Sequence, residues 1–100
     1  MSKEELDSLR KEVDRINDKL VKLLAERKQL TDQILELKKE LNLTAHQPDR
    51  EQESLKHIRK LAQKLGLELE FAENIMKKVI KETRVSQEKA LTNQNALSDN

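Results

Sequence analysis

The sequence predicts an all-α fold of three helices, one very long and two shorter, that form an intertwined homodimeric helical bundle. Three observations predict it. Apolar residues recur from Leu6 to Leu41 at three- and four-residue spacing, the period of one helix face. The single proline, Pro48, and the single glycine, Gly66, divide the chain into three segments. Phe71 is the only aromatic residue, so the core must be aliphatic, which suits helix packing.

The first helix is the long one and is expected over residues 3–41. Its apolar stripe comprises Leu6, Leu9, Val13, Ile16, Leu20, Leu23, Leu30, Ile34, Leu37 and Leu41. Ser2 followed by Glu5 resembles a capping box, and no helix breaker interrupts the pattern that follows. At about 1.5 Å per residue, such a helix is roughly 60 Å long.

The second helix is expected over residues 48–65, because Pro48 suits the first helical position. Its stripe comprises Leu55, Ile58, Ala62 and Leu65. Gly66 then predicts a left-handed cap at the end of this helix.

The third helix is expected over residues 69–91. Its inward side chains are Ala72, Ile75, Met76, Val79 and Ile80. Residues 92–100 are polar and are expected to form a disordered tail, so the helical domain covers residues 1–91.

The predicted dimer follows from the lengths of the helices. The two shorter helices, about 27 and 33 Å long, could lie along one side of the first helix but could not surround it. With 39% charged and 35% hydrophobic residues, the chain also has a thin core. The simplest cover for the remaining surface is a second copy in a two-fold dimer.

Composition argues against several classes of partner. The 20 Lys and Arg residues are interspersed with 19 Asp and Glu residues, so no basic surface is expected for nucleic acid. The acidic, polar N-terminus does not resemble a signal peptide, and no apolar run reaches membrane-spanning length, so we expect no membrane partner and a cytoplasmic location. Cysteine is absent and His46 and His57 lack ligand spacing, so we expect no metal site.

Polar residues interrupt the apolar faces. Arg27 stands where the next apolar residue of the stripe belongs, and a buried cation is costly unless an anion meets it. Lys38 follows after about 20° of helical rotation and roughly 16 Å, so the two cations could grip one small anion. Arg10 lies roughly 25 Å and 100° from Arg27 and could reach the same ligand only from the partner chain.

The shorter helices repeat this pattern. Continuing their stripes at the same spacing places Glu51, Thr83 and Gln87 on inward faces. Together with Arg27 and Lys38, these residues predict one internal polar pocket. Simpler interpretations stay open: Arg27 could set the register of a coiled coil, Lys38 could be solvated, and Glu51 could complement the helix dipole. Thr83 and Gln87, near a helix end, could be exposed.

These residues also match a known family pattern. The matching stretches are Leu9-Arg10, Val13-Asp14-Arg15-Ile16-Asn17, Leu23-Leu24-Ala25-Glu26-Arg27, Lys38, Pro48-Asp49-Arg50-Glu51 and Ile80-Lys81-Glu82-Thr83-Arg84-Val85-Ser86-Gln87. In order, spacing and residue type, the chain from about residue 4 to 91 resembles the all-helical class of chorismate mutases. The resemblance implies conversion of chorismate to prephenate on the route to phenylalanine and tyrosine. That Claisen rearrangement needs no cofactor, nucleophile or proton transfer.

The resemblance implies roles for the catalytic residues. Arg27 and Arg10, the latter from the other subunit, are expected to bind substrate carboxylates. Lys38 is expected to bridge a carboxylate and the ether oxygen, and Gln87 to donate its amide hydrogen to that oxygen.

Four further residues are implied in substrate binding. Glu51 is expected to accept from the ring hydroxyl group, and Thr83 to lie near a carboxylate. Gln47 occupies a position where many relatives have Asp, which mostly offers its backbone N–H to the substrate hydroxyl. Arg50 is expected close to the pocket.

Two alternatives belong to other functional classes. A related isochorismate pyruvate lyase would use a similar fold and cationic clamp on an isomeric substrate. A non-catalytic helical regulatory or interaction module would keep the scaffold without the chemistry. Both a free-standing enzyme and part of a larger bifunctional enzyme fit the sequence.

Overall fold

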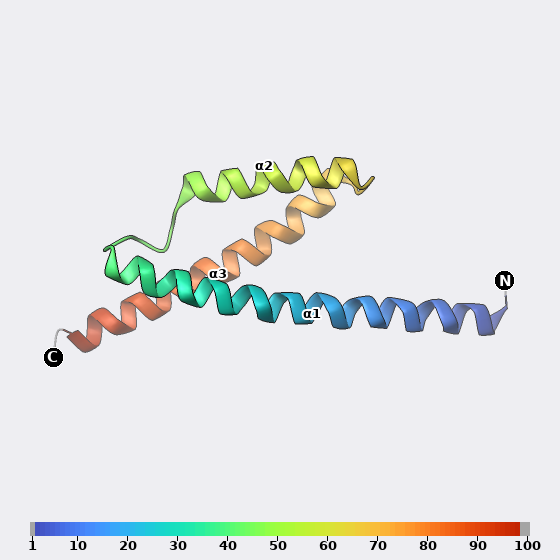
Figure 1. Cartoon of the computed structure of the whole chain (residues 1–100), viewed down its shortest axis with the longest axis horizontal. Coiled ribbons are helices and arrows are strands. Elements are labelled where there is room, and N and C mark those ends of the chain that lie inside the picture. The colour runs from blue at the N-terminus through green and yellow to red at the C-terminus, as the bar shows by residue number, and fades with distance from the viewer. Residues whose placement is uncertain (1, 99–100) are drawn as a thin grey trace. The chain divides into compact units, whose positions relative to one another are not determined.

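The computed structural model describes the backbone of residues 2–98 and the side chains of residues 2–92. It contains three helices, α1 (Lys3–Glu40), α2 (Pro48–Lys64) and α3 (Leu69–Ser98), and no strand within the described residues (Figure 1). The predicted all-α class and the three helices are confirmed. The chain divides into two compact units, Met1–Ile34 and Leu35–Asn100. Among residues 2–98, no helix combines the length and apolarity needed to cross a bilayer.

Both ends of α1 are capped by local hydrogen bonds. At its start the backbone N–H of Glu5 donates to the Ser2 hydroxyl at 3.1 Å, which confirms Ser2 as the capping residue. At its end Asn42 adopts a left-handed φ of 56°, and the N–H of Leu43 donates to the Lys38 carbonyl at 2.8 Å. These are the features of a Schellman turn, which stops the helix and folds the following loop back onto its last turn.

The end of α2 has the same construction with glycine in place of asparagine. Gly66 has a φ of 70°, and the N–H of Leu67 donates to the Ala62 carbonyl at 2.9 Å. The predicted left-handed cap is therefore confirmed. This turn reverses the chain so that α2 and α3 pack side by side (Figure 1).

The third helix continues further than its polar sequence suggests. It ends at Ser98 rather than near residue 91, so the helix end expected from the sequence lies too early. The disordered tail expected over residues 92–100 stays a prediction. Residues 99 and 100 lie outside the described part of the chain. No glycine or proline follows Leu91, and a helix without a breaker can continue through polar residues.

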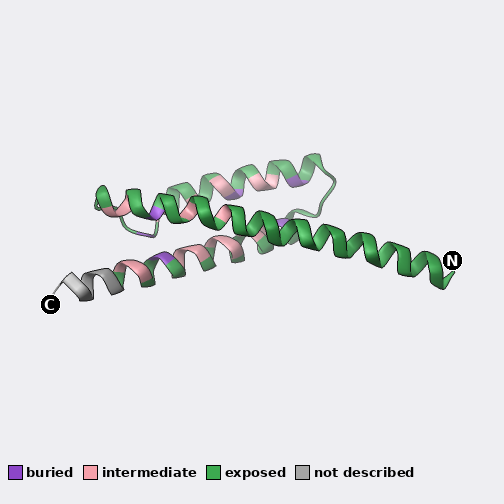
Figure 2. Cartoon of the chain, turned by 60° about the horizontal axis from the view of Figure 1, so that its bottom comes forward, coloured by how far each residue is buried: buried purple, intermediate pink, exposed green. Residues whose placement is uncertain are grey.

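The packed faces of α2 and α3 carry the stripes expected from the sequence. Leu55, Ala62 and Ala72 are buried; Ile58, Met76, Val79 and Ile80 are half-buried (Figure 2). Two predicted members are exposed instead, Leu65 at 71% and Ile75 at 48%. Leu65 is the cap residue beyond the last turn of α2, and Ile75 lies at the flank of the face that Ala72 and Met76 share.

The apolar stripe of α1 is exposed in the part of the chain that the structure describes. Its members stay exposed, including Leu9 at 54%, Ile16 at 49% and Leu23 at 59%, as the green ribbon in Figure 2 shows. Among residues 2–34, only Arg27 and Thr31 are half-buried. So long an exposed apolar face is typical of an interaction surface rather than of a monomer.

Candidate active site

The candidate site is built around the ammonium group of Lys38, in the last turn of α1. Its Nζ donates to Gln87 Oε1 at 2.8 Å and to the Ala45 carbonyl at 3.1 Å. Gln87 and Ala45 are only 5% and 7% exposed. The turn at Asn42 brings Ala45 back to the end of α1, while α3 supplies Gln87. The loop that follows α1 and the distant helix α3 therefore both hold the Lys38 cation.

The contact with Lys38 also orients the Gln87 amide. An ammonium group only donates hydrogen bonds, so the amide oxygen must face it. The donor end of the amide, Nε2, then faces away from Lys38. The pair therefore directs an ammonium group and an amide N–H from one place, which suits an oxygen that gains negative charge.

The environment of Lys38 shifts its pKa. Burial lowers the pKa of the Lys38 ammonium, because the charged form loses contact with water, and the negative charge of Glu51 opposes this only in part. The net result is a pKa below the ordinary value of a lysine. Lys38 is therefore partly desolvated, the condition under which an ammonium interacts most strongly with an anion.

Glu51, in the first turn of α2, is surrounded by basic groups. Arg84 Nη1, from α3, donates to both Glu51 oxygens, at 2.9 and 3.1 Å. His46 Nε2, from the preceding loop, lies 3.4 Å from Glu51 Oε2. The side chains of Glu51 and Arg84 are 20% and 27% exposed. Glu51 and Lys38 therefore belong to one charged cluster.

Sequence reasoning missed two members of this cluster. Arg84 follows Ile80 by four residues and precedes Gln87 by three, so the same helical spacing places it on the inward face of α3. That signal was available. His46, which lacks metal-ligand spacing in the sequence, is 53% exposed but contacts Glu51, because the turn at Asn42 carries the loop there.

The remaining predicted residues have other local partners. Thr83 is half-buried and donates to the Val79 carbonyl at 3.1 Å. The Gln47 side chain donates to the Thr44 carbonyl at 3.0 Å. Arg50 is 74% exposed and pairs with Glu53 at 3.3 Å. None of these three contacts involves the Lys38 ammonium.

Arg10 and Arg27, the two arginines predicted to bind substrate carboxylates, lie in the unit Met1–Ile34. Arg10 is 70% exposed beside Asp7, at 3.9 Å. Arg27 is half-buried. Their predicted roles in binding carboxylates stay predictions.

The cavity beside Lys38 differs from the predicted internal pocket. It has a volume of about 450 Å³ and is lined by Lys38, Lys39, Asn42, Leu43, Thr44, Ala45, Glu88, Leu91 and Thr92. Of the residues expected to share one pocket, Lys38 alone lines it. This cavity is therefore not the predicted internal pocket.

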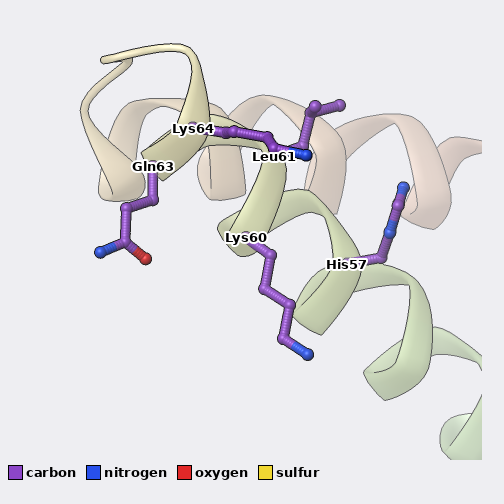
Figure 3. A pocket seen from close by; sticks show the side chains of 5 residues that line it. All are labelled: His57, Lys60, Leu61, Gln63 and Lys64. Atoms are coloured by element: carbon purple, nitrogen blue, oxygen red, sulfur yellow. The ribbon is translucent and has the colours of Figure 1, made fainter.

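A second cavity of about 490 Å³ lies along the C-terminal half of α2 (Figure 3). It is lined by His57, Lys60, Leu61, Gln63 and Lys64, which include none of the predicted site residues. We assign no function to it.

Comparison with known proteins gives consistent matches. Residues 9–88 match the family described as chorismate mutase type II. The chain is 31% identical over 88 residues to a chorismate mutase of Methanocaldococcus jannaschii, covering 88% of this chain and 89% of that protein. It is 47% identical over 58 residues to a bifunctional chorismate mutase/prephenate dehydratase of Aquifex aeolicus, covering 58% of this chain and 16% of that protein.

A third relative is the T-protein of Enterobacter agglomerans, 32% identical over 83 residues. The match covers 83% of this chain and 22% of the T-protein. The chain therefore spans less than a quarter of the Aquifex aeolicus and Enterobacter agglomerans proteins and nearly all of the Methanocaldococcus jannaschii chorismate mutase.

Proposed function

This chain belongs to the chorismate mutase type II family, and we propose that it is an isomerase that converts chorismate to prephenate. The observation that carries the proposal is the Lys38 ammonium, held by the buried Gln87 amide and the Ala45 carbonyl. Both side chains lie within the matched residues 9–88. The activity serves the synthesis of phenylalanine and tyrosine.

The reaction requires electrostatics rather than acid–base chemistry. The ether C–O bond of chorismate breaks as a new C–C bond forms within the same molecule, and no proton moves. The ether oxygen gathers negative charge in the transition state, where Lys38 and Gln87 donate to it. The substrate is a dianion that reacts only in a compact conformer, so cations that hold both carboxylates supply the remaining catalysis.

The full site is proposed to form in an intertwined homodimer. The exposed stripe of α1 supports this, because a second copy offers the same apolar face and could cover it. In this arrangement Arg10 of the partner subunit binds one substrate carboxylate. Arg27, from the same chain as Lys38, also binds a substrate carboxylate. The cytoplasmic location expected from the sequence stays a prediction.

The ring of the substrate is proposed to contact the α2 side of the site. Glu51 accepts a hydrogen bond from the ring hydroxyl group, and the backbone N–H of Gln47 donates to the same group. Thr83 lies near a carboxylate. Arg50 lies close to the pocket, and substrate would draw its exposed side chain from Glu53.

The direct test is to incubate the purified chain with chorismate and follow the loss of chorismate absorbance. Prephenate has the same mass as chorismate, so it is identified by its conversion to phenylpyruvate in acid. We expect chorismate to be consumed and prephenate to accumulate. Isochorismate is supplied in a parallel reaction. Release of pyruvate from isochorismate, with chorismate unchanged, would identify the lyase instead; no turnover of either substrate would favour the non-catalytic module.

The pH profile of kcat/KM is expected to be nearly flat from mildly acid to mildly basic pH, because the Gln87 amide does not titrate. It should fall at alkaline pH as Lys38 loses its proton, with an apparent pKa below that of an ordinary lysine. In the kcat profile this fall should move to higher pH, because the bound dianion favours the ammonium form.

Steady-state kinetics across pH would check this expectation. His46 contacts Glu51, so the profile is repeated with a His46→Asn variant, which removes the imidazole from this contact. A steep loss of activity between about pH 7 and about pH 5 that persists in this variant would contradict the role given to Gln87.

A further inference from the structure

The ion pair between Arg84 and Glu51 points to a role that the family resemblance did not assign. We propose that Arg84 is a positioning residue, which holds the Glu51 carboxylate toward the substrate hydroxyl group and keeps it from pairing with Lys38. This inference rests on the proposed function. It concerns how the site is arranged before chorismate arrives.

The Glu51 backbone is fixed, but its carboxylate needs a further constraint. The N–H of Glu51 donates to the Gln47 carbonyl at 3.0 Å, which anchors the first turn of α2. The side chain beyond it has several rotatable bonds. Arg84 Nη1 donates to both carboxylate oxygens, at 2.9 and 3.1 Å. Charge-assisted bonds to both oxygens define the direction of the carboxylate, and each oxygen keeps a further lone pair for a substrate hydroxyl.

Lys38 is the competitor for the same carboxylate. Its ammonium is bound by Gln87 and Ala45, yet it also senses the charge of Glu51. Without Arg84, the basic groups left around Glu51 are Lys38 and His46. A carboxylate that turned to Lys38 would neutralise the charge that the ether oxygen requires and would turn away from the substrate hydroxyl.

Arg84 acts through Glu51 rather than on substrate. Its guanidinium lies between two carboxylates, since Nε is also 3.9 Å from Glu88. A cation compensated in this way is poorly placed to bind a third anion. Its contribution is to direct Glu51, and this defines the measurement that detects it.

A purely structural role is the rival explanation, because the pair also joins α2 to α3. The chain offers a matched control. Arg59 and Glu73 form a second Arg–Glu pair between the same helices, with Nη1 and Oε1 3.0 Å apart. Neither residue has been given a part in the site. Arg59→Leu therefore reports what loss of an interhelical pair does to activity through stability alone.

The experiment is a double-mutant cycle on kcat/KM for chorismate, with Arg84→Leu and Glu51→Gln singly and combined. We expect Arg84→Leu to lower kcat/KM by about 10- to 100-fold, as expected for a misplaced catalytic group. In the Glu51→Gln background the same substitution should cost less than about threefold, because no carboxylate is left to direct.

Two further variants complete the test. One Arg84 nitrogen makes both contacts, so the point charge of Arg84→Lys should keep kcat/KM within about threefold of wild type. Arg59→Leu should lower the thermal midpoint at least as much as Arg84→Leu, yet keep kcat/KM within about twofold of wild type. Circular dichroism confirms that each variant is helical at the assay temperature.

The outcomes separate this inference from the proposed function. If wild type converts chorismate but Arg84→Leu is equally costly with Glu51 and with Gln at position 51, the positioning role is wrong. A loss in Arg59→Leu that matches the loss in Arg84→Leu would also overturn it. If wild type leaves chorismate unchanged, the proposed function itself fails and this inference falls with it.

Discussion

Lys38→Ala is expected to lower kcat by about 10² to 10³-fold, the usual loss when a donor to a developing oxyanion is removed. The structure places the charged Lys38 donor directly on the Gln87 amide oxygen. Its loss removes the positive charge that faces the ether oxygen. It also removes the ammonium group that orients the Gln87 amide. Because the ammonium also bridges a substrate carboxylate, KM should rise too, but the larger change falls on kcat.

A lysine of an exposed ion pair supplies the control. Lys78 pairs with Glu82 at 3.1 Å on α3, and Lys78→Ala should leave kcat within about twofold of wild type, as surface ion pairs contribute little. Steady-state kinetics on both variants, with helicity checked by circular dichroism, makes the comparison. A Lys38→Ala enzyme with wild-type kcat would refute the assignment of Lys38 to the ether oxygen.

Much of the fold follows from local signals that can be recognised in the sequence alone. Ser2, Pro48 and Gly66 mark helix ends through capping and backbone geometry, which depend on a few adjacent residues. The end of α3 lacks such a signal, since polar composition alone does not stop a helix. The helix expected from the sequence therefore ends near residue 91, whereas α3 continues to Ser98.

The site shows the same division between local and tertiary information. Lys38 and Gln87 were identified because helical spacing places each on an inward face, and the structure joins them. The contact of His46 with Glu51 depends on the left-handed turn at Asn42, which no apolar pattern marks. Helical spacing also places Arg84 on the inward face of α3, but Arg84 was recognised only as part of the family pattern.

The predicted shared pocket goes beyond what the described residues of this chain show. The stripe of α1 is exposed here, and the cavity beside Lys38 includes none of the other proposed ligands. A helix stripe encodes that a surface is buried but not which chain buries it. The family resemblance named the second chain, because it implies that Arg10 comes from the partner subunit. This assignment therefore needs a test that shows whether Arg10 of a site belongs to the other chain.

The second large effect expected is complementation between two inactive variants, Arg10→Ala and Arg27→Ala. Each alone should lose at least about 10²-fold in kcat/KM, because each removes a cation that holds a substrate carboxylate. If each site takes Arg27 from one chain and Arg10 from the other, a mixed dimer contains one site with both arginines intact. Equal co-expression should then restore about one quarter of wild-type activity, since half the dimers are mixed and half their sites are complete.

The measurement uses two affinity tags to isolate the mixed dimer, whose activity should be about half that of wild type per dimer. Sedimentation of the wild-type chain should show twice the monomer mass. The matched control is a mixture of Arg10→Ala with a doubly substituted Arg10→Ala/Arg27→Ala chain, which offers no intact site under any pairing and should stay inactive. Recovery in the first mixture alone identifies a site shared between chains. Absence of recovery from a verified mixed dimer would mean that both arginines act within one chain, contrary to the helical geometry that separates them by roughly 25 Å.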